Sequence, residues 1–335
     1  MRSTPGSAEV TDATVLAIDG LRVVFDTEQG PVQAVRGVTM DVMAGECLAV
    51  VGESGSGKSQ LFLACLGLLA GNGRALGSAR LQGAELVGGE ERGLASLRGA
   101  AVGLVSQDPM NALTPHLRIG EQLTEFVLER GRMTRPEARG RALELLRSVG
   151  IADPETRYDQ YPHELSGGQR QRVAIAMALM PGPVLLIADE PTTALDVTVQ
   201  AQVLDVFRGL RGQGLTIVLV THDLGVVAGL ADRVAVMYAG AVVELATADQ
   251  VFSAPRHPYT AALLEAIPRL DAEPGARLAH IEGQPPGSQE RLQGCPFAPR
   301  CAFARERCRE SEPRLEWRDG RASACHAPLP GGWTP

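Results

Sequence analysis

Lysine is almost absent from this sequence. Its 335 residues include 31 arginines and a single lysine, Lys58. Arginine serves as the cation almost everywhere, so the one exception marks a position that needs a compact ammonium on a flexible stem rather than a planar guanidinium. Lys58 is therefore the first residue that we expect to take part in a site.

The chain also lacks a strong charge and a long apolar run. The formal net charge is -7, with 44% hydrophobic and 21% charged residues, which excludes a largely disordered chain and argues against a dedicated nucleic-acid binder. The longest uncharged apolar run, Val173–Ala188, has 16 residues and is interrupted by Pro181, whereas a membrane span needs about 20. The first residues lack the apolar region of a signal peptide. We expect a cytosolic chain whose link to a membrane comes through a partner.

The first part of the chain is rich in β-forming residues. Residues 15–51 contain three such segments, with a turn expected at Gly30-Pro31. The last segment, Cys47–Val51, is continuously apolar, and a helical pattern begins near Gly57 and continues to Leu69. This order predicts a buried strand that leads directly into a helix.

Later segments predict helices and then an alternation of strands and helices. Residues 110–165 show helical patterns, with a helix start at Thr134-Arg-Pro-Glu137. From Val184 onward, apolar strands alternate with helices, which implies an α/β fold with a mostly parallel sheet. We expect a disordered stretch at 1–13, an α/β domain at 14–270, and a small tail at 271–335 that follows a Pro/Gly-rich linker.

A phosphate-binding loop is the most specific motif. Gly52-Glu-Ser-Gly-Ser-Gly-Lys58-Ser59 matches G-x-x-x-x-G-K-[ST] and lies between the predicted strand and helix. Its backbone N–H groups, including those around Gly52, Ser54, Gly55 and Gly57, are expected to hold phosphate oxygens. Lys58 is expected to contact the β- and γ-phosphates and Ser59 to ligate Mg²⁺. The chain is therefore predicted to be a P-loop NTPase.

Two acids end a later apolar strand. Asp189 closes the run that begins at Val184, and Glu190 follows directly. Acids at the carboxyl edge of a parallel sheet lie where ligands bind. Asp189 is expected to reach Mg²⁺, and Glu190 to orient the attacking water or accept its proton. A solvated helix cap is the alternative.

A second helix start follows the helical block. In Leu165-Ser166-Gly167-Gly168-Gln169, Ser166 and Gln169 have the spacing of a capping box, and the two glycines leave the helix N-terminus open. The segment is either a second anion site or an ordinary capped helix.

With these motifs in this order, the chain resembles the ATP-binding subunit of an ABC transporter. The resemblance covers about residues 15–270. It implies a nucleotide-binding P-loop NTPase of the ABC type, with an N-terminal antiparallel β subdomain and the helical insertion at about 110–165. It adds an adenine-stacking Phe25, a Gln loop at Gln107 that also approaches Mg²⁺, a D-loop at Leu195-Asp196 and a switch His222. Gln107, Glu190 and His222 are the implied catalytic residues.

The resemblance also implies a dimer. Two such domains meet head to tail, so that ATP lies between the P-loop of one and the segment Ser166–Gln169 of the other. One helix N-terminus cannot neutralise a triphosphate from both sides, so a second, facing one completes the site. ATP then acts as a ligand of the closed dimer, and its hydrolysis releases the dimer.

Other segments are similar to those of oligopeptide and dipeptide importers. These are Ser106–Pro115, Val251–Leu264 and Gly294–Cys301, together with Gln60 beside the P-loop. Ser106 departs from the Phe usual at that place. This resemblance implies a second ATPase subunit, in this group a paralogue, two transmembrane permeases and an extracytoplasmic solute-binding protein, with the chain peripheral on the cytoplasmic face of the inner membrane. Importers of nickel chelates and other small solutes share these features, so the solute stays open.

Four of the six cysteines gather in the tail. Cys47 and Cys65 lie in apolar surroundings and are expected to be buried. The others have the spacing C-x5-C-x6-C-x16-C, which lacks the C-x-x-C pairs of zinc ribbons; they are Cys295, Cys301, Cys308 and Cys325. The resemblance implies a [4Fe–4S] cluster on all four. Zinc, with His326 in place of one thiolate, and unliganded thiols are the alternatives.

The tail is also rich in arginine. Arg300, Arg305, Arg307 and Arg309 either offset the charge of a thiolate-ligated cluster or form a solvated basic face. A zinc-bound nucleic-acid module is a third interpretation of the tail.

A soluble ABC ATPase of DNA repair or translation is the rival interpretation of the whole chain. The interval from Gly52 to Leu165 carries no heptad run of the kind that repair enzymes insert, and the sequence holds one cassette, whereas the translation factors carry two.

Overall fold

The computed structural model describes residues 13–89, 97–107, 112–193, 195–267, 280–287 and 292–330. The chain divides into two compact units. The first consists of Met1–Met43, Cys47–Gly89 and Thr221–Pro335, and the second of Ala44–Glu46 and Glu90–Val220. Predictions for residues 1–12, for the linker residues 271–279 and for residues 108–111 of the Gln-loop segment lie outside the described residues.

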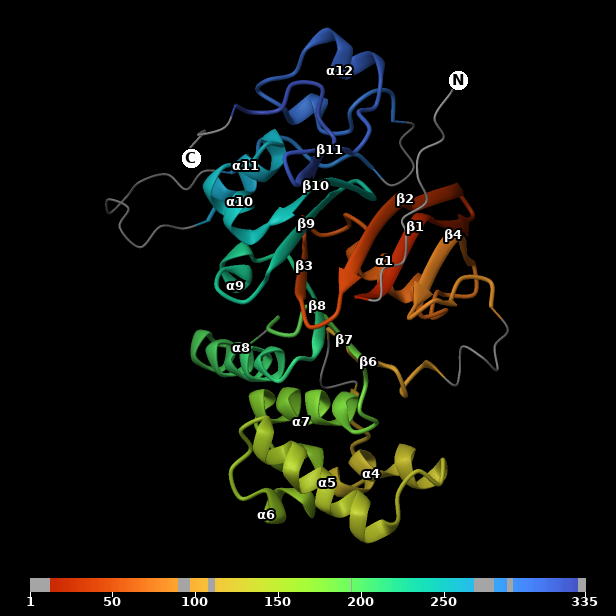
Figure 1. The fold of residues 1–335 in the computed structure, drawn as a ribbon, viewed down its shortest axis with the longest axis vertical. Helices are drawn as coiled ribbons and strands as arrows, with labels where there is room; N and C mark the ends of the chain where they lie inside the picture. Colours follow the sequence, from red (N-terminus) through yellow and green to blue (C-terminus); the bar gives the residue numbers. More distant parts are fainter. Residues whose placement is uncertain are drawn as a thin grey trace. The chain divides into compact units, whose positions relative to one another are not determined.

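The first unit begins with an antiparallel sheet. Its strands are β1 (Thr14–Thr27), β2 (Gly30–Met43), β4 (Gly73–Leu81) and β5 (Ala84–Glu85), in the order β2-β1-β4-β5 (Figure 1). The β-rich N-terminal segment and the antiparallel subdomain are thus confirmed. The expected turn at Gly30-Pro31 is wrong by two residues, because the turn lies at 28–29 and Gly30 already pairs with Thr27.

A second sheet in this unit carries the strand before the P-loop. β3 (Cys47–Val51) pairs in parallel with β9 (Arg233–Tyr238), and β10 (Ala241–Thr247) pairs antiparallel with β9. The tail continues the sheet, since β12 (Arg321–Ser323) pairs with β10 and β11 (Glu316–Arg318) with β12. This antiparallel continuation, which makes the sheet mixed, was not predicted.

The described residues of the first unit form six helical segments. They are α1 (Lys58–Cys65), α9 (Leu224–Val227), α10 (Ala248–Ser253), α11 (Pro258–Glu265), the 3-10 helix η2 (Ala298–Arg300) and α12 (Glu306–Glu310). The helix predicted near Gly57 is confirmed, but it ends at Cys65 rather than near Leu69. Gly67 follows in a left-handed conformation (φ 63°), which stops the helix.

The second unit combines a parallel sheet with helices. β6 (Val102–Val105), β7 (Leu185–Asp189) and β8 (Thr216–Thr221) run parallel, as the alternation of strands and helices predicted. The helices are α4 (Ile119–Glu129), α5 (Arg135–Ser148), α6 (Pro154–Tyr158), the 3-10 helix η1 (Pro162–Glu164), α7 (Gly167–Leu179) and α8 (Val197–Gly212). Within the described part of 110–165 there is no strand, which confirms the helical insertion (Figure 1).

The predicted start of α5 is confirmed in detail. Thr134 is its N-cap, and the Thr134 N–H donates a 2.7 Å hydrogen bond to Glu137 in a capping box. The expected Pro lies in the first turn. α5 ends at Ser148, and Gly150 follows with φ 74°.

One apolar core of the first unit joins its sheet to the tail. Tyr238 from β9, Tyr259 from α11 and Phe297 from the tail are each at most 2% exposed and pack together, and Cys295 and Cys301 pack against the same core. The tail is therefore anchored by buried aromatic side chains. Among the described residues, no helix has the length and apolar character needed to span a membrane.

Candidate functional site

The P-loop follows β3 and ends at Ser59, in the first turn of α1. At Gly52 the backbone has φ 154°, and a Cβ there would lie 2.2 Å from the carbonyl oxygen of Met237. At Gly57, with φ 95°, a Cβ would lie 2.3 Å from the carbonyl oxygen of Ala34. Contacts this short exclude any side chain, so glycine is required at both ends of the loop.

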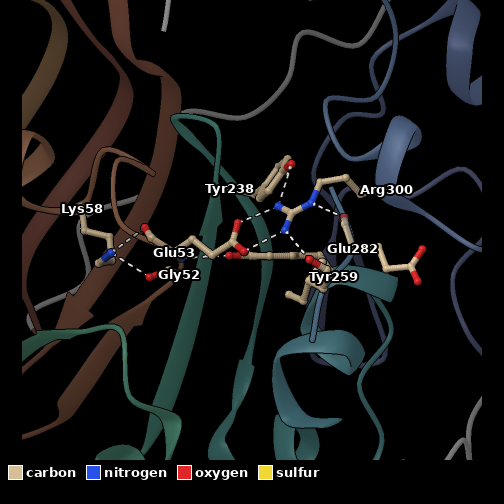
Figure 2. Close-up of polar contacts among 8 residues, drawn as sticks. Gly52, Glu53, Lys58, Tyr238, Tyr259, Glu282 and Arg300 are labelled. Atoms are coloured by element: carbon tan, nitrogen blue, oxygen red, sulfur yellow. Dashed lines mark hydrogen bonds and ion pairs between the residues drawn. The ribbon is translucent and has the colours of Figure 1, made fainter. Parts of the chain in front are cut away.

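Lys58 lies inside this loop. Its side chain is 5% exposed. Its ammonium donates hydrogen bonds to the carbonyl oxygens of Gly52 (2.8 Å) and Glu53 (2.9 Å) (Figure 2). It also donates to Ser56 Oγ at 3.4 Å. Three acceptors around one compact ammonium explain why the only lysine of the chain occurs here, since the planar fork of an arginine would not satisfy them.

The N-terminus of α1 lies at the end of the P-loop. Gly57 is its N-cap and forms no side-chain cap hydrogen bond, and a helix start beside a glycine-rich loop suits a phosphate. Ser54 and Gly55 are exposed, whereas Ser59 and Gln60 in the first turn are half-buried. A cavity of about 630 Å³ is lined by the loop residues Glu53 to Ser56 among others. Loop, helix and cavity together can hold a phosphorylated ligand.

Two other predicted residues of this unit lie on surface segments. Phe25 is half-buried near the end of β1 and packs against β4, because a Cβ at Gly73 would lie 2.6 Å from the Phe25 ring. His222 is exposed and follows β8 directly. Neither lines the cavity of the P-loop.

In the second unit, Glu190 and Gln107 meet. Glu190 follows β7 with a left-handed backbone (φ 48°), and its N–H donates to the Val220 carbonyl oxygen at 2.8 Å. Its carboxylate accepts hydrogen bonds from Gln107 Nε2 (2.9 Å) and from Thr193 Oγ1 (3.0 Å). Asp189, half-buried, ends β7 just before it. Two donors orient a carboxylate at a strand end, an arrangement suited to positioning a water molecule. Sequence reasoning missed Thr193, whose only signal was its place three residues after Glu190.

The segment Ser166–Gln169 forms the predicted capping box at the start of α7. Ser166 N–H donates to Gln169 Oε1 at 2.9 Å, and Gln169 N–H donates to Ser166 Oγ at 3.3 Å. Gly168 lies against α8, since a Cβ there would be 2.2 Å from Val199 Cγ1. Asp196 caps α8 by accepting a 2.9 Å hydrogen bond from Val199 N–H. The predicted signature and D-loop residues are thus helix caps, and Gly167 has open space around it.

The four tail cysteines line one small cavity. Cys295, Cys301, Cys308 and Cys325 are joined there by His257 and His326. Burial raises the pKa of the Cys295 and Cys301 thiols, and raises that of Cys325 to about 11. None of the six cysteines is in a disulfide. The structure therefore brings together four cysteines that span 31 residues of the tail.

The cavity does not have the geometry of a single-ion site. No group of three or more His, Cys, Asp or Glu side chains among the described residues is arranged to hold one metal ion. His326 Nε2 lies 2.9 Å from the main-chain oxygen of Ser311. The other two cysteines, Cys47 and Cys65, are buried as expected, and burial raises the pKa of Cys65 to about 12.

The tail arginines have two different environments. Arg305, Arg307 and Arg309 are exposed, in agreement with a solvated face. The side chain of Arg300 is 4% exposed and forms an ion pair with Glu53 of the P-loop. For Arg300, a place on a solvated face is therefore wrong.

Known proteins match almost the whole chain. The family model described as ABC transporter matches residues 35–193, and the one described as oligopeptide/dipeptide transporter, C-terminal region, matches residues 243–308. The oligopeptide transport ATP-binding protein OppD of Salmonella typhimurium is 48% identical over 316 residues, which cover 94% of each chain. This chain belongs to the ABC transporter family. The dipeptide transport ATP-binding protein DppD of Bacillus subtilis is likewise 48% identical over 290 residues, 86% of each chain.

Solved structures agree with the family. A dimeric ATP-binding cassette in a post-hydrolysis state, bound to ADP and Pi, matches 70% of this chain and 98% of its own, with a TM-score of 0.62 and 28% identity. The protein cbiO1 of Clostridium perfringens, part of an ABC transporter complex, matches 72% of this chain and 91% of its own, with a TM-score of 0.61 and 31% identity. The fold of this ABC transporter subunit is that of an ATP-binding cassette.

Proposed function

We propose that this chain is the ATP-hydrolysing subunit that drives an ABC importer of di- and oligopeptides. The observation that carries the proposal is the near full-length similarity to oligopeptide and dipeptide transport ATP-binding proteins, which extends through the C-terminal region. The P-loop around Lys58 and the Gln107–Glu190 pair supply the parts that ATP hydrolysis needs.

In this proposal the P-loop binds Mg²⁺-ATP. The N–H groups from Gly52 to Ser59 hold the phosphates, Lys58 exchanges its loop carbonyls for the β- and γ-phosphates, and Gln60 supports the first turn of α1. Ser59, Asp189 and Gln107 hold Mg²⁺, directly or through water. Phe25 stacks on adenine.

Hydrolysis depends on Glu190. Its carboxylate, held by Gln107 and Thr193, orients the attacking water and accepts its proton, while His222 contacts the γ-phosphate. Glu190 has a left-handed backbone (φ 48°), a strained conformation of the kind that clusters at active sites.

A second ATPase subunit, in this proposal a paralogue, completes the site. The segment Ser166, Gly167, Gly168 and Gln169 and the D-loop residue Asp196 face the ATP held by the partner. The open space at Gly167, beside the N-terminus of α7 that Ser166 caps, leaves room for a phosphate. Two permeases and an extracytoplasmic binding protein complete the importer, with this chain peripheral on the cytoplasmic face.

The tail is proposed to hold a [4Fe–4S] cluster. Such a cluster takes one thiolate at each iron, so its four sulfur ligands surround the group without converging on a single ion. The cavity lined by Cys295, Cys301, Cys308 and Cys325 supplies this donor set. When bound, the cluster supplies a redox-active iron centre. Zinc is the alternative, and it would need His326 to leave Ser311.

Affinity isolation of the tagged chain from membranes tests the importer assignment. Two permeases, a second ATPase and a solute-binding protein that retains a peptide are the expected co-purifying components. Recovery of the chain with nucleic-acid or ribosomal proteins would contradict the proposal, and a metal chelate on the binding protein would correct the solute.

A further inference from the structure

One arginine of the cysteine tail reaches the P-loop. Arg300 ends the short 3-10 helix that lies between Cys295 and Cys301. Its Nη1 and Nη2 donate hydrogen bonds of 2.7 and 2.9 Å to the two carboxylate oxygens of Glu53, the second residue of the P-loop (Figure 2). This bidentate geometry is the strongest form of an arginine–carboxylate pair.

The remaining donors of Arg300 are also used. Nε donates to the Glu282 carbonyl oxygen at 3.0 Å, Nη2 to that of Ile281 at 3.2 Å, and Nη1 to Tyr238 Oη at 3.3 Å. The bond to Glu53 is the main reason that the pKa of Arg300 is raised. A buried guanidinium with this many partners has one orientation, so it holds the Glu53 carboxylate in one place.

Glu53 is held on its main chain as well. Its N–H donates to Tyr259 Oη at 2.9 Å, and its carbonyl oxygen accepts from Lys58 Nζ at 2.9 Å (Figure 2). The same oxygen accepts from Ser56 N–H at 3.2 Å. A single residue therefore connects Arg300 of the tail with the lysine of the P-loop.

The backbone that carries Arg300 is anchored by packing as well. Phe297, three residues before it, is 2% exposed. Its ring lies 5.4 Å from that of Tyr238 and 5.3 Å from that of Tyr259, the same two tyrosines that contact Arg300 and Glu53. The tail and the P-loop thus share one buried anchor.

We propose that Arg300 is a positioning residue for ATP binding. Through Glu53 it holds the P-loop in the curl that receives the phosphates, and it neutralises a carboxylate that lies next to the site of an anionic ligand. A change at Cys295 or Cys301 that moves Arg300 would thereby change the affinity of the P-loop for ATP. The proposal rests on the ATP-binding function proposed above. Its physical basis is preorganisation, because a loop already in its bound shape loses less entropy on binding.

Calorimetric titration of the purified chain with ATP tests this role. Arg300→Gln is expected to raise the Kd for ATP at least about tenfold. In the double variant with Glu53→Gln the Kd is expected to be no higher than in Arg300→Gln alone, because both changes break the same contact, so the two effects are not additive. The exposed Arg309→Gln, also in the tail, is the matched control and should stay within about twofold of wild type.

Turnover in the assembled complex separates positioning from a loss of folded protein. Arg300→Gln is expected to raise the KM for ATP with kcat per folded chain nearly kept, whereas a merely structural role would lower kcat at constant KM. If Arg300→Gln does not fold, Arg300→Lys keeps the charge without the fork and should raise the Kd at least about threefold.

Three results would overturn the proposal. They are wild-type ATP affinity in folded Arg300→Gln, wild-type affinity in Arg300→Lys where that variant carries the test, or additive losses in the double variant. Failure of the wild-type chain to bind ATP would instead refute the proposed function, so the two failures are distinguishable.

Discussion

The side-chain amide of Gln107 donates a 2.9 Å hydrogen bond to the carboxylate of Glu190, which lies 83 residues later in the chain. The two meet because β6 and β7 are parallel neighbours in which Val105 pairs with Ala188. Gln107 follows Val105 by two residues, and Glu190 follows Ala188 by two residues. Both side chains therefore lie at the carboxyl end of the sheet, where ligands of α/β proteins bind.

Replacing Glu190 tests this arrangement. We expect Glu190→Gln to keep ATP binding, to trap an ATP-bound dimer and to lower turnover at least ~10²-fold, because an amide cannot accept the proton of the attacking water. Phosphate release and size-exclusion chromatography with ATP measure the two effects. The control is Glu129→Gln, at an exposed helix end. Near-normal turnover of Glu190→Gln would remove Glu190 from the proposed mechanism.

Replacing Lys58 tests the cradle of the P-loop. Lys58→Arg is expected to raise the Kd for ATP at least ~10-fold, because a guanidinium does not fit the space that three loop acceptors define around the ammonium. Calorimetry gives the Kd, and thermal unfolding without nucleotide shows whether the fold survives. The reverse exchange Arg74→Lys, in an exposed ion pair with Asp26, should leave both unchanged. Wild-type affinity of Lys58→Arg would contradict the prediction.

The two glycines of the signature segment differ in their surroundings, and so should their variants. Gly168→Ala is expected to lower the free energy of unfolding by about 1–3 kcal/mol, because its Cβ would clash with Val199. Gly167→Ala meets no neighbour and should retain near wild-type stability. Urea unfolding compares the two, and Val199→Ala should rescue Gly168→Ala by removing the clashing methyl. Equal stabilities of the two glycine variants would refute the packing argument.

The cysteine cavity makes a prediction for metal content. An anaerobic preparation should be brown, with about four irons per chain, and Cys301→Ser should lose most of that iron. Cys65→Ala, which removes a buried thiol remote from the tail in sequence, is the control and should keep it. Elemental analysis and absorption spectra provide the measurement. A colourless protein with stoichiometric zinc would refute the cluster.

Features that depend on neighbouring residues were predictable from the sequence. The capping boxes at Thr134 and Ser166, the glycine-bounded P-loop and the helix at Lys58 were each recognised from short patterns and are present. Strands whose partners are distant were missed. β4 exists because it pairs with β1, and the two three-residue strands of the tail exist because β12 pairs with β10 and β11 with β12. No local pattern reveals such a partner.

Charged side chains also fall into two groups: those whose position follows from residues near in sequence, and those whose position depends on distant ones. By itself, the sequence determined where phosphate chemistry belongs, because a turn that binds anions needs glycine and lysine within a few residues of one another. Only the tertiary structure decided that Arg300 pairs with Glu53, 247 residues away. A guanidinium exposed on a tail and one buried against the P-loop have the same sequence signal. The choice between them depends on how Phe297, Tyr238 and Tyr259 pack, which is a property of the folded chain.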